Sequence, residues 1–222
     1  MEILPNLHMI DGINANAYLV LGDQIILIDT GMPGNQEKIF DYLQNVLKSK
    51  PEDIKTILIT HQHVDHTGSL YELKKITNAD VAVFKDEADY VSGKKPASGP
   101  FYMRIGNRLM SFFTSYRTVE PDIILNEEDV LEGYRVIHTP GHTPGSISLY
   151  NPENRVIIVG DTLIFNGEKV NGPPSMLIDN QEALKKSVEK ISKLDCEVML
   201  SGHGKPLTKN ASGLIMEYYK TL

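Results

Sequence analysis

The sequence predicts an α/β fold arranged as a four-layer αββα sandwich, in which two sheets pack face to face and helices cover the outside. Short apolar runs of strand length alternate along the chain with segments whose apolar residues recur at helical spacing. This order of elements occurs in both halves of the 222 residues, and each half ends in a helix followed by one more strand. Each half therefore supplies one sheet and its helices.

The first half begins with a predicted hairpin, because the apolar runs 17–21 and 25–28 are separated by a Gly-Asp turn. Apolar positions within 39–47 recur at helical spacing with polar residues between them, which indicates an amphipathic helix. Residues 57–59 are typical of a short buried strand, and 70–76 of the helix that follows it.

The second half repeats this pattern, with a helix that we expect to be capped by Asp179 and to end near Leu194. Its predicted strands are 134–137, 146–150, 156–159 and 198–200. Between the halves, 93–122 contains an apolar, partly helical stretch that we interpret as an insertion within a single domain of residues 1–222. This insertion predicts a lid or a dimer contact, and an extra core helix is the alternative.

Composition and charge narrow the class of partner. The chain has 29 acidic and 22 basic residues and a formal net charge of -7, which disfavours nucleic acid. No apolar run approaches the length that spans a bilayer, so we expect no membrane partner. The single cysteine, Cys196, cannot form an internal disulfide, and the first residues lack the features of a secretory signal. We therefore expect a cytoplasmic protein that acts on a small-molecule substrate, either as a monomer or as a homodimer.

The strongest chemical signal is a cluster of metal-ligand residues directly after the apolar run 57–59. His61, His63, Asp65 and His66 occur within six residues, in the order His-x-His-x-Asp-His. A strand delivers the chain to a sheet edge, and the loop beyond it can turn several of these side chains inward. So many imidazoles and carboxylates close together are unfavourable unless cations hold them.

Three further strands end in the same way. Each apolar run leads into a glycine-flanked residue that can bind metal, and these residues are His142, Asp161 and His203. Glycine beside a ligand lets the backbone turn sharply and approach the site closely. Taken singly, each of the three is more typical of a turn or a cap. Together with the cluster they predict a metal site, whereas His8 and His138 fit structural roles better.

This set of motifs resembles the metallo-β-lactamase superfamily, and the resemblance covers essentially the whole chain. It includes an Asp-Thr-Gly turn at 29–31, the Thr-Pro-Gly-His-Thr-Pro-Gly loop at 139–145, and the glycines beside the last two ligands. The resemblance implies an αββα sandwich with two metals in the cleft between the outer edges of the sheets. It assigns one metal to His61, His63 and His142, the other to Asp65, His66 and His203, and a bridging role to Asp161. Nitrogen and oxygen ligands suit zinc, our first choice, and also iron or manganese.

Two residues near the predicted site keep alternative interpretations. Asp29 matches a family position that supports the site without binding metal, and a simple turn aspartate is equally compatible with the sequence. Cys196 stands at the start of the last predicted strand and is interpreted as a small core residue.

The predicted mechanism is hydrolysis by a metal-bridging hydroxide, because two divalent ions that share a water lower its pKa. Asp65 is the candidate catalytic residue, since it can orient this hydroxide as well as bind metal. The sequence has no Gly-x-Ser-x-Gly elbow and no cysteine in the cluster, so the nucleophile is solvent. Tyr102 and Tyr116 are candidate proton donors to the leaving group, although packing or surface roles are more common for such residues.

The resemblance favours the thioesterase and lactonase branch, and therefore a hydrolase for an ester, thioester or lactone bond of a small, partly apolar substrate. The apolar insertion supports a substrate with an acyl or alkyl part. Glutathione thioesters are disfavoured because 19 residues follow His203 (222 minus 203), and β-lactams because the full ligand set is unlike that of the β-lactam-cleaving members. The alternatives are an oxygenase that resembles persulfide dioxygenases and uses one iron, a phosphodiesterase of the same fold, and a non-catalytic metal-holding module.

Overall fold

The computed structural model describes residues 1–10, 13–99 and 113–222. The chain divides into two compact units, of which the first comprises Met1–Ala97 and Phe101–Ile124 and the second Ser98–Pro100 and Leu125–Leu222. Each unit has its own sheet and its own apolar core. The single domain proposed from sequence stays a prediction. Most of the apolar segment expected to form a lid or interface, residues 100–112, lies outside the described residues.

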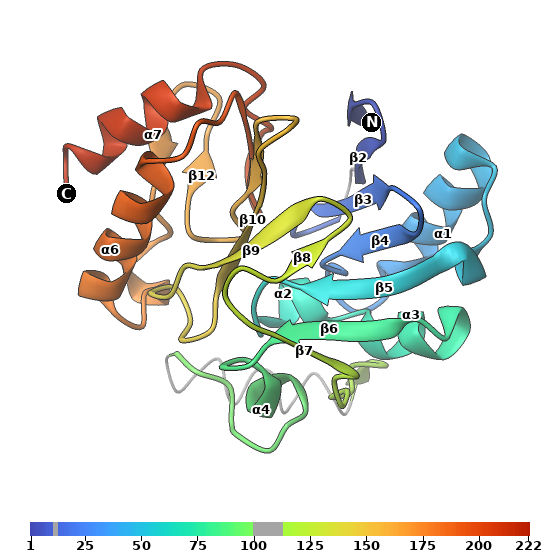
Figure 1. Cartoon of the computed structure of the whole chain (residues 1–222). Helices are drawn as coiled ribbons and strands as arrows, with labels where there is room; N and C mark the ends of the chain where they lie inside the picture. The colour runs from blue at the N-terminus through green and yellow to red at the C-terminus, as the bar shows by residue number, and fades with distance from the viewer. Residues whose placement is uncertain (11–12, 100–112) are drawn as a thin grey trace. The chain divides into compact units, whose positions relative to one another are not determined.

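The first unit is built on a seven-stranded sheet whose strands follow one another in sequence order (Figure 1, blue to yellow-green). The strands are β1 (Glu2–Leu4), β2 (Leu7–Ile10), β3 (Ala17–Leu21), β4 (Ile25–Ile28), β5 (Ile54–Ile59), β6 (Asp80–Phe84) and β7 (Ile123–Leu125). The first four pair antiparallel, and β4, β5 and β6 pair parallel. Because neighbouring parallel strands end at the same edge of a sheet, the residues that follow β4 and β5 are brought side by side.

Helices of the first unit cover its core through their apolar faces. They are α1 (Gln36–Tyr42), the π-helical η1 (Leu43–Leu47), the 3-10 helix η2 (Pro51–Asp53), α2 (Val64–Thr67), α3 (Leu70–Thr77) and α4 (Ala88–Val91). Ile39 and Leu43 from the first helical stretch and Leu73 from α3 are fully buried in one cluster with Ile57 and Val81 of the sheet. The predicted hairpin, the amphipathic helix predicted within 39–47 and the helix predicted at 70–76 are confirmed.

The second unit contains a five-stranded sheet in the order β14-β11-β10-β9-β8. These strands are β8 (Val130–Leu131), β9 (Tyr134–His138), β10 (Ile147–Asn151), β11 (Val156–Ile158) and β14 (Val198–Leu200). All pairs are antiparallel except β11 with β14, which is parallel. A separate hairpin is formed by β12 (Ile164–Phe165) and β13 (Val170–Asn171). All four strands predicted for this half are present within a residue or two.

The helices α6 (Gln181–Ser192) and α7 (Ala211–Tyr219), with the short η3 (Ser175–Leu177), complete the second unit. Asn180 caps α6, since its side chain accepts a hydrogen bond from the Ala183 amide at 3.0 Å. The cap predicted at Asp179 is therefore wrong by one residue. Asn180 has the extended backbone that directs an N-cap side chain at the first turn, and Asp179 is exposed. Cys196 is buried in the core of this unit, as predicted.

Several elements were not predicted from sequence, among them the N-terminal strands β1 and β2, the parallel strand β6 and helix α7. Each is short or lacks a turn signal that marks its boundary, so periodicity alone does not separate it from a loop. Within the described ranges, no helix has both the length and the apolar character that a bilayer-spanning helix needs.

Candidate metal centre

Four predicted ligands converge in the first unit, where β5 passes into the short helix α2 (Figure 1). The ring centroids of His61 and His66 lie 4.0 Å apart, and those of His61 and His63 lie 4.9 Å apart. Asp65 Oδ2 is 3.9 Å from His66 Nε2. The three imidazoles are at most 5% exposed. Buried rings this close would repel one another strongly if all of them were positively charged imidazolium ions. The arrangement therefore suits neutral imidazoles that bind a shared cation.

The backbone of this turn holds the ligands in place. The His63 carbonyl accepts hydrogen bonds from the amides of His66 and Thr67 at 2.9 and 3.0 Å, which start α2 directly after His63. The Thr67 hydroxyl donates to the same carbonyl at 3.1 Å. A Cβ on Gly68 would lie 2.5 Å from Pro33, so glycine is required here by a close backbone approach.

Asp29 supports this turn from the end of β4. Its Oδ1 accepts the Thr60 amide at 2.8 Å, and its Oδ2 accepts the Thr60 hydroxyl at 2.7 Å and His66 Nδ1 at 2.8 Å. Asp29 is 1% exposed and has a left-handed backbone with φ 58°. The next residue, Thr30, donates both its amide and its hydroxyl to the His66 carbonyl. Of the two interpretations left open by the sequence, the supporting role is the one that the structure selects.

These hydrogen bonds define the tautomers of two ligands. Thr60 gives its one hydroxyl proton to Asp29, so at 3.1 Å its oxygen accepts from His61 Nδ1. His66 likewise donates from Nδ1 to the Asp29 carboxylate. Both rings then present an unprotonated Nε2, which is the form that binds a metal ion.

The other three predicted ligands meet in the second unit. Asp161 Oδ2 lies 3.5 Å from His142 Nε2 and 3.4 Å from His203 Nε2. His142 and Asp161 are buried, and the side chain of His203 is 34% exposed. A hydrogen bond of 2.7 Å from the Gly202 amide to the Gly160 carbonyl joins the turns that carry His203 and Asp161. A single carboxylate oxygen between two imidazoles is the geometry expected of a shared ligand.

The loop that carries His142 is held against helix α6. Gly141 has φ 138°, and a Cβ there would lie 2.5 Å from the Leu184 backbone. Its carbonyl accepts the Asn180 amide at 3.0 Å, and Ser187 donates to the Pro140 carbonyl at 2.7 Å. Only glycine allows the loop to approach the helix this closely.

Buried hydroxyl groups connect the strand ends beneath these ligands. Thr139 Oγ1 lies 3.0 Å from Ser148 Oγ and accepts a hydrogen bond from Thr162 at 3.2 Å. Thr139, Ser148 and Thr162 are fully buried. The turn beside Asp161 is thus tied to the one that leads into His142. His138 Nε2, 2.9 Å from the Pro144 carbonyl, closes the same loop, which agrees with the structural role expected for it.

The donor set of each unit fits first-row divalent metals. The ligands are imidazoles and carboxylates, and the only cysteine of the chain lies in the apolar core, where burial raises the pKa of its thiol. Of the two tyrosines considered as proton donors, Tyr116 forms a hydrogen bond with Thr67, and burial raises its pKa. Tyr102 lies outside the described residues. Sequence reasoning missed Thr60 and the buried hydroxyls, which no motif distinguishes from ordinary core threonines and serines.

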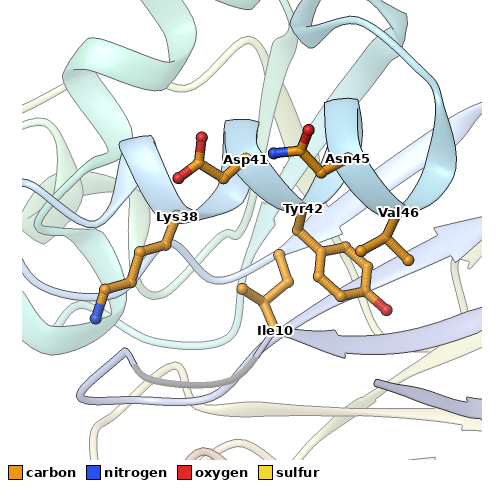
Figure 2. Close-up of a pocket in the computed structure, with 6 residues that line it drawn as sticks. All are labelled: Ile10, Lys38, Asp41, Tyr42, Asn45 and Val46. Atoms are coloured by element: carbon orange, nitrogen blue, oxygen red, sulfur yellow. The ribbon is translucent and has the colours of Figure 1, made fainter.

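A surface pocket of about 320 Å³ lies beside α1 and η1 in the first unit. Figure 2 shows that it is lined by Ile10, Lys38, Asp41, Tyr42, Asn45 and Val46. His8 Nδ1 lies 3.1 Å from the Tyr42 hydroxyl, which gives His8 a structural partner. None of the seven predicted ligands lines this pocket, so it is separate from the metal-ligand groups.

Comparison with known proteins identifies the type of chain. The model of the metallo-β-lactamase superfamily matches residues 10–203. The probable metallo-hydrolase YflN of Bacillus subtilis is 29% identical over 202 residues, which cover 82% of this chain and 76% of the relative. The acyl-coenzyme A thioesterase MBLAC2 of Homo sapiens is 27% identical over 208 residues, which cover 86% of this chain and 74% of the relative.

Solved structures give the same result for the fold. The crystal structure of TTHA1623 in a di-iron-bound form is 25% identical with a TM-score of 0.72, and the match covers 97% of this chain and 99% of that one. A metallo-β-lactamase family protein from Thermus thermophilus, 21% identical, has a TM-score of 0.75 over 97% of this chain and 78% of that one. The fold class predicted from sequence is confirmed.

Proposed function

Because the chain belongs to the metallo-β-lactamase superfamily, we propose that it is a hydrolase with two metal ions that cleaves an ester, thioester or lactone bond of a small acyl substrate. Thioesters are the first choice within this class. The likeness to an acyl-coenzyme A thioesterase over 86% of the chain supports that choice. Relatives named as metallo-hydrolases support the broader class of reaction.

The observation that supports this proposal is that each unit holds its own compact group of residues that can bind metal. The first unit holds His61, His63, Asp65 and His66 close together, with the tautomers of two rings defined. The second unit places one oxygen of Asp161 between His142 and His203. We propose that the two parts act as one site, with Asp161 as the shared ligand.

Bound divalent metals would supply hydroxide near neutral pH and would polarise the carbonyl oxygen of the substrate. Asp65 is proposed to accept a hydrogen bond from the attacking water and so to orient it, as its carboxylate lies in the turn beside His66. Thr60 and Asp29 hold the rings of His61 and His66 with Nε2 unprotonated and able to bind metal. The orientation of both rings is therefore set before the substrate binds. These groups position and activate water, and no side chain forms a bond with the substrate.

Zinc is the proposed metal, since imidazole and carboxylate ligands suit it and it is the usual ion for such hydrolytic chemistry. The likeness to a protein described in a di-iron-bound form keeps iron as the second choice. We also propose a cytoplasmic location, since the one cysteine of the chain is buried as a free thiol, which is typical of a reducing compartment.

The test combines metal analysis with a substrate panel. Protein loaded with Zn²⁺ or Fe²⁺ should contain about two ions per chain, and it should hydrolyse short and long acyl thioesters, carboxylic esters and lactones. His61→Ala should lose metal and activity. His8→Ala removes another buried histidine, which lies in the structural pair with Tyr42, and should keep both. Saturation at one ion, oxygen uptake by an iron-loaded form, or phosphodiesters as the best substrates would each contradict the proposal.

A further inference from the structure

Helix α6 donates hydrogen bonds to three backbone carbonyls of the loop that leads into His142. The pairs are the His138 carbonyl with Lys190 Nζ at 3.2 Å, the Pro140 carbonyl with Ser187 Oγ at 2.7 Å, and the Gly141 carbonyl with the Asn180 amide at 3.0 Å. The three donors recur at helical spacing and therefore lie on one face of α6. The loop runs along this face in the direction opposite to the helix.

The hydrogen bond of Ser187 differs from the usual one of a serine in a helix. Such a serine commonly donates to a carbonyl three or four residues earlier in its own helix. Ser192 does this, because its Oγ donates to the Glu189 carbonyl at 2.8 Å. Ser187 donates instead to the Pro140 carbonyl, 47 positions away in the sequence. Its hydroxyl therefore stabilises the loop rather than the helix.

Of the three hydrogen bonds, that of Ser187 is best placed to hold the loop. Ser187 is 3% exposed, whereas the side chain of Lys190 is 43% exposed and is also paired with Glu127. Exposed ammonium groups are screened by water and salt, so they contribute little. Pro140 stands two residues before His142, so a displaced Pro140 carbonyl changes the direction in which the imidazole is presented.

The residue between these carbonyls is held from the other side. Thr139 Oγ1 lies 3.0 Å from Ser148 Oγ and accepts a hydrogen bond from Thr162, the residue after Asp161. The loop is thus fixed between α6 and the sheet of the second unit. His142 Nε2 lies 3.5 Å from Asp161 Oδ2. This separation depends on both attachments of the loop, because each fixes the backbone that carries one of the two side chains.

We propose that Ser187 is a positioning residue for the metal centre: its hydroxyl holds the Pro140 carbonyl against α6 and so keeps the His142 imidazole in place beside Asp161. This inference deepens the proposed function and rests on it in taking His142 as a metal ligand. Ser187 acts through the backbone of the loop, so it affects how a ligand is held and not which atoms bind. Partners behind the ligands typically change metal affinity by about 10- to 100-fold when removed.

The experiment uses Co²⁺ as a spectroscopic probe in the full chain. Ser187→Ala removes the hydroxyl that reaches the loop. Ser192→Ala is the matched control, because Ser192 is also buried on α6 and also donates to a backbone carbonyl, but within the helix. His142→Ala and the double variant Ser187→Ala/His142→Ala complete the set. Co²⁺ affinity is measured by competition with a chelator, the visible d–d absorption is recorded, and thermal unfolding of each metal-free variant is followed in parallel.

We expect Ser187→Ala to weaken Co²⁺ binding by about tenfold and to shift the d–d bands. Ser192→Ala should match the wild type in affinity and bands, whatever its unfolding temperature. The double variant should bind Co²⁺ no more weakly than His142→Ala alone, since both changes act through one ligand.

Three results would overturn the proposal. The first is unchanged affinity and bands in Ser187→Ala, even if its unfolding temperature falls, because the hydroxyl would then serve stability alone. The second is an equal loss of affinity in Ser192→Ala, and the third is full additivity of Ser187→Ala with His142→Ala.

Failure of the proposed function is distinguishable from failure of this inference. A wild-type chain that takes up one Co²⁺, or that hydrolyses none of the panel, contradicts the binuclear hydrolase, and the comparison of Ser187→Ala with Ser192→Ala still decides the role of Ser187. A His142→Ala variant that binds Co²⁺ like the wild type would overturn both proposals, because His142 would then not be a ligand.

Discussion

Asp29 and His66, 37 positions apart in the sequence, are joined by a hydrogen bond of 2.8 Å between Oδ2 and Nδ1. Asp29 follows β4, and His66 lies in α2 beyond the end of β5. The pair exists because β4 and β5 are parallel neighbours that end at one edge of the sheet. The bond keeps the proton of the His66 ring on Nδ1 and leaves Nε2 unprotonated, which is the form that binds metal. A residue outside the predicted ligand set therefore determines how a predicted ligand is presented.

Asp29→Asn should therefore weaken metal binding without removing a ligand. The side chain of asparagine has one accepting oxygen where aspartate has two, so it cannot keep all three hydrogen bonds from Thr60 and His66. The His66 ring then loses the bond that fixes its tautomer. We expect affinity to fall by about 10- to 100-fold, measured by competition with a chelator. Asp23→Asn, in the exposed turn between β3 and β4, is the control. Equal affinity in the two variants would exclude the supporting role of Asp29.

Asp161→Asn should change the number of metals bound. Its Oδ2 is placed between two imidazoles, and replacing a carboxylate by an amide removes the negative charge that a pair of cations would share. Elemental analysis should give about one ion per chain in place of about two. Asp195→Asn, which alters an exposed aspartate paired with Arg155, should leave the number unchanged. Two tightly held ions in Asp161→Asn would rule out a bridging carboxylate.

Asp65→Asn should reduce turnover far more than it alters folding. The carboxylate is partly exposed in the turn, and the amide has the same shape but is a poor acceptor for the proton of attacking water. A loss of about 100-fold or more in kcat is expected for a group that acts in the transition state. Asp41→Asn, an exposed change on α1, serves as the reference. Retention of near-normal kcat would remove Asp65 from the mechanism.

Gly141→Ala should destabilise the second unit. The new methyl group would clash with the Leu184 backbone at 2.5 Å, and φ 138° is strained for alanine. The two effects together cost about 2–4 kcal/mol, measured as a shift of the urea midpoint. Gly34→Ala is a matched control, because Gly34 also has positive φ, 94°, but has nothing within 4 Å of the added methyl. If both variants lose the same stability, backbone strain alone accounts for the need for glycine.

His8 should contribute to the loss of stability in acid. Burial lowers the pKa of His8 below its ordinary value of 6.5, so the unfolded chain binds more protons than the folded one in the range below pH 6.5. The free energy of unfolding therefore falls as pH falls through that range. His8→Gln keeps a polar group beside Tyr42 without the titration, so its stability should change less between pH 7 and pH 5. Identical pH curves for the two proteins would contradict this assignment.

The sequence by itself determined which residues are candidates for binding metal. His61, His63, Asp65 and His66 occur within six residues after an apolar run, and the other three candidate ligands each follow a run of strand length. Strand ends and glycine turns are local patterns, so they can be read without knowing what lies across the sheet. The strands of the second half could be placed for the same reason.

Only the tertiary structure decided what supports those ligands. Asp29 could be a turn residue or a partner of a ligand until the pairing of β4 with β5 placed it beside His66. The hydrogen bond between Thr162 and Thr139 spans 23 positions, and it joins the turn beside Asp161 to the one that leads into His142. Periodicity shows which face of an element is buried but not which distant side chain lies opposite it. Partners of this kind are therefore determined by strand order and register, which only the folded chain displays.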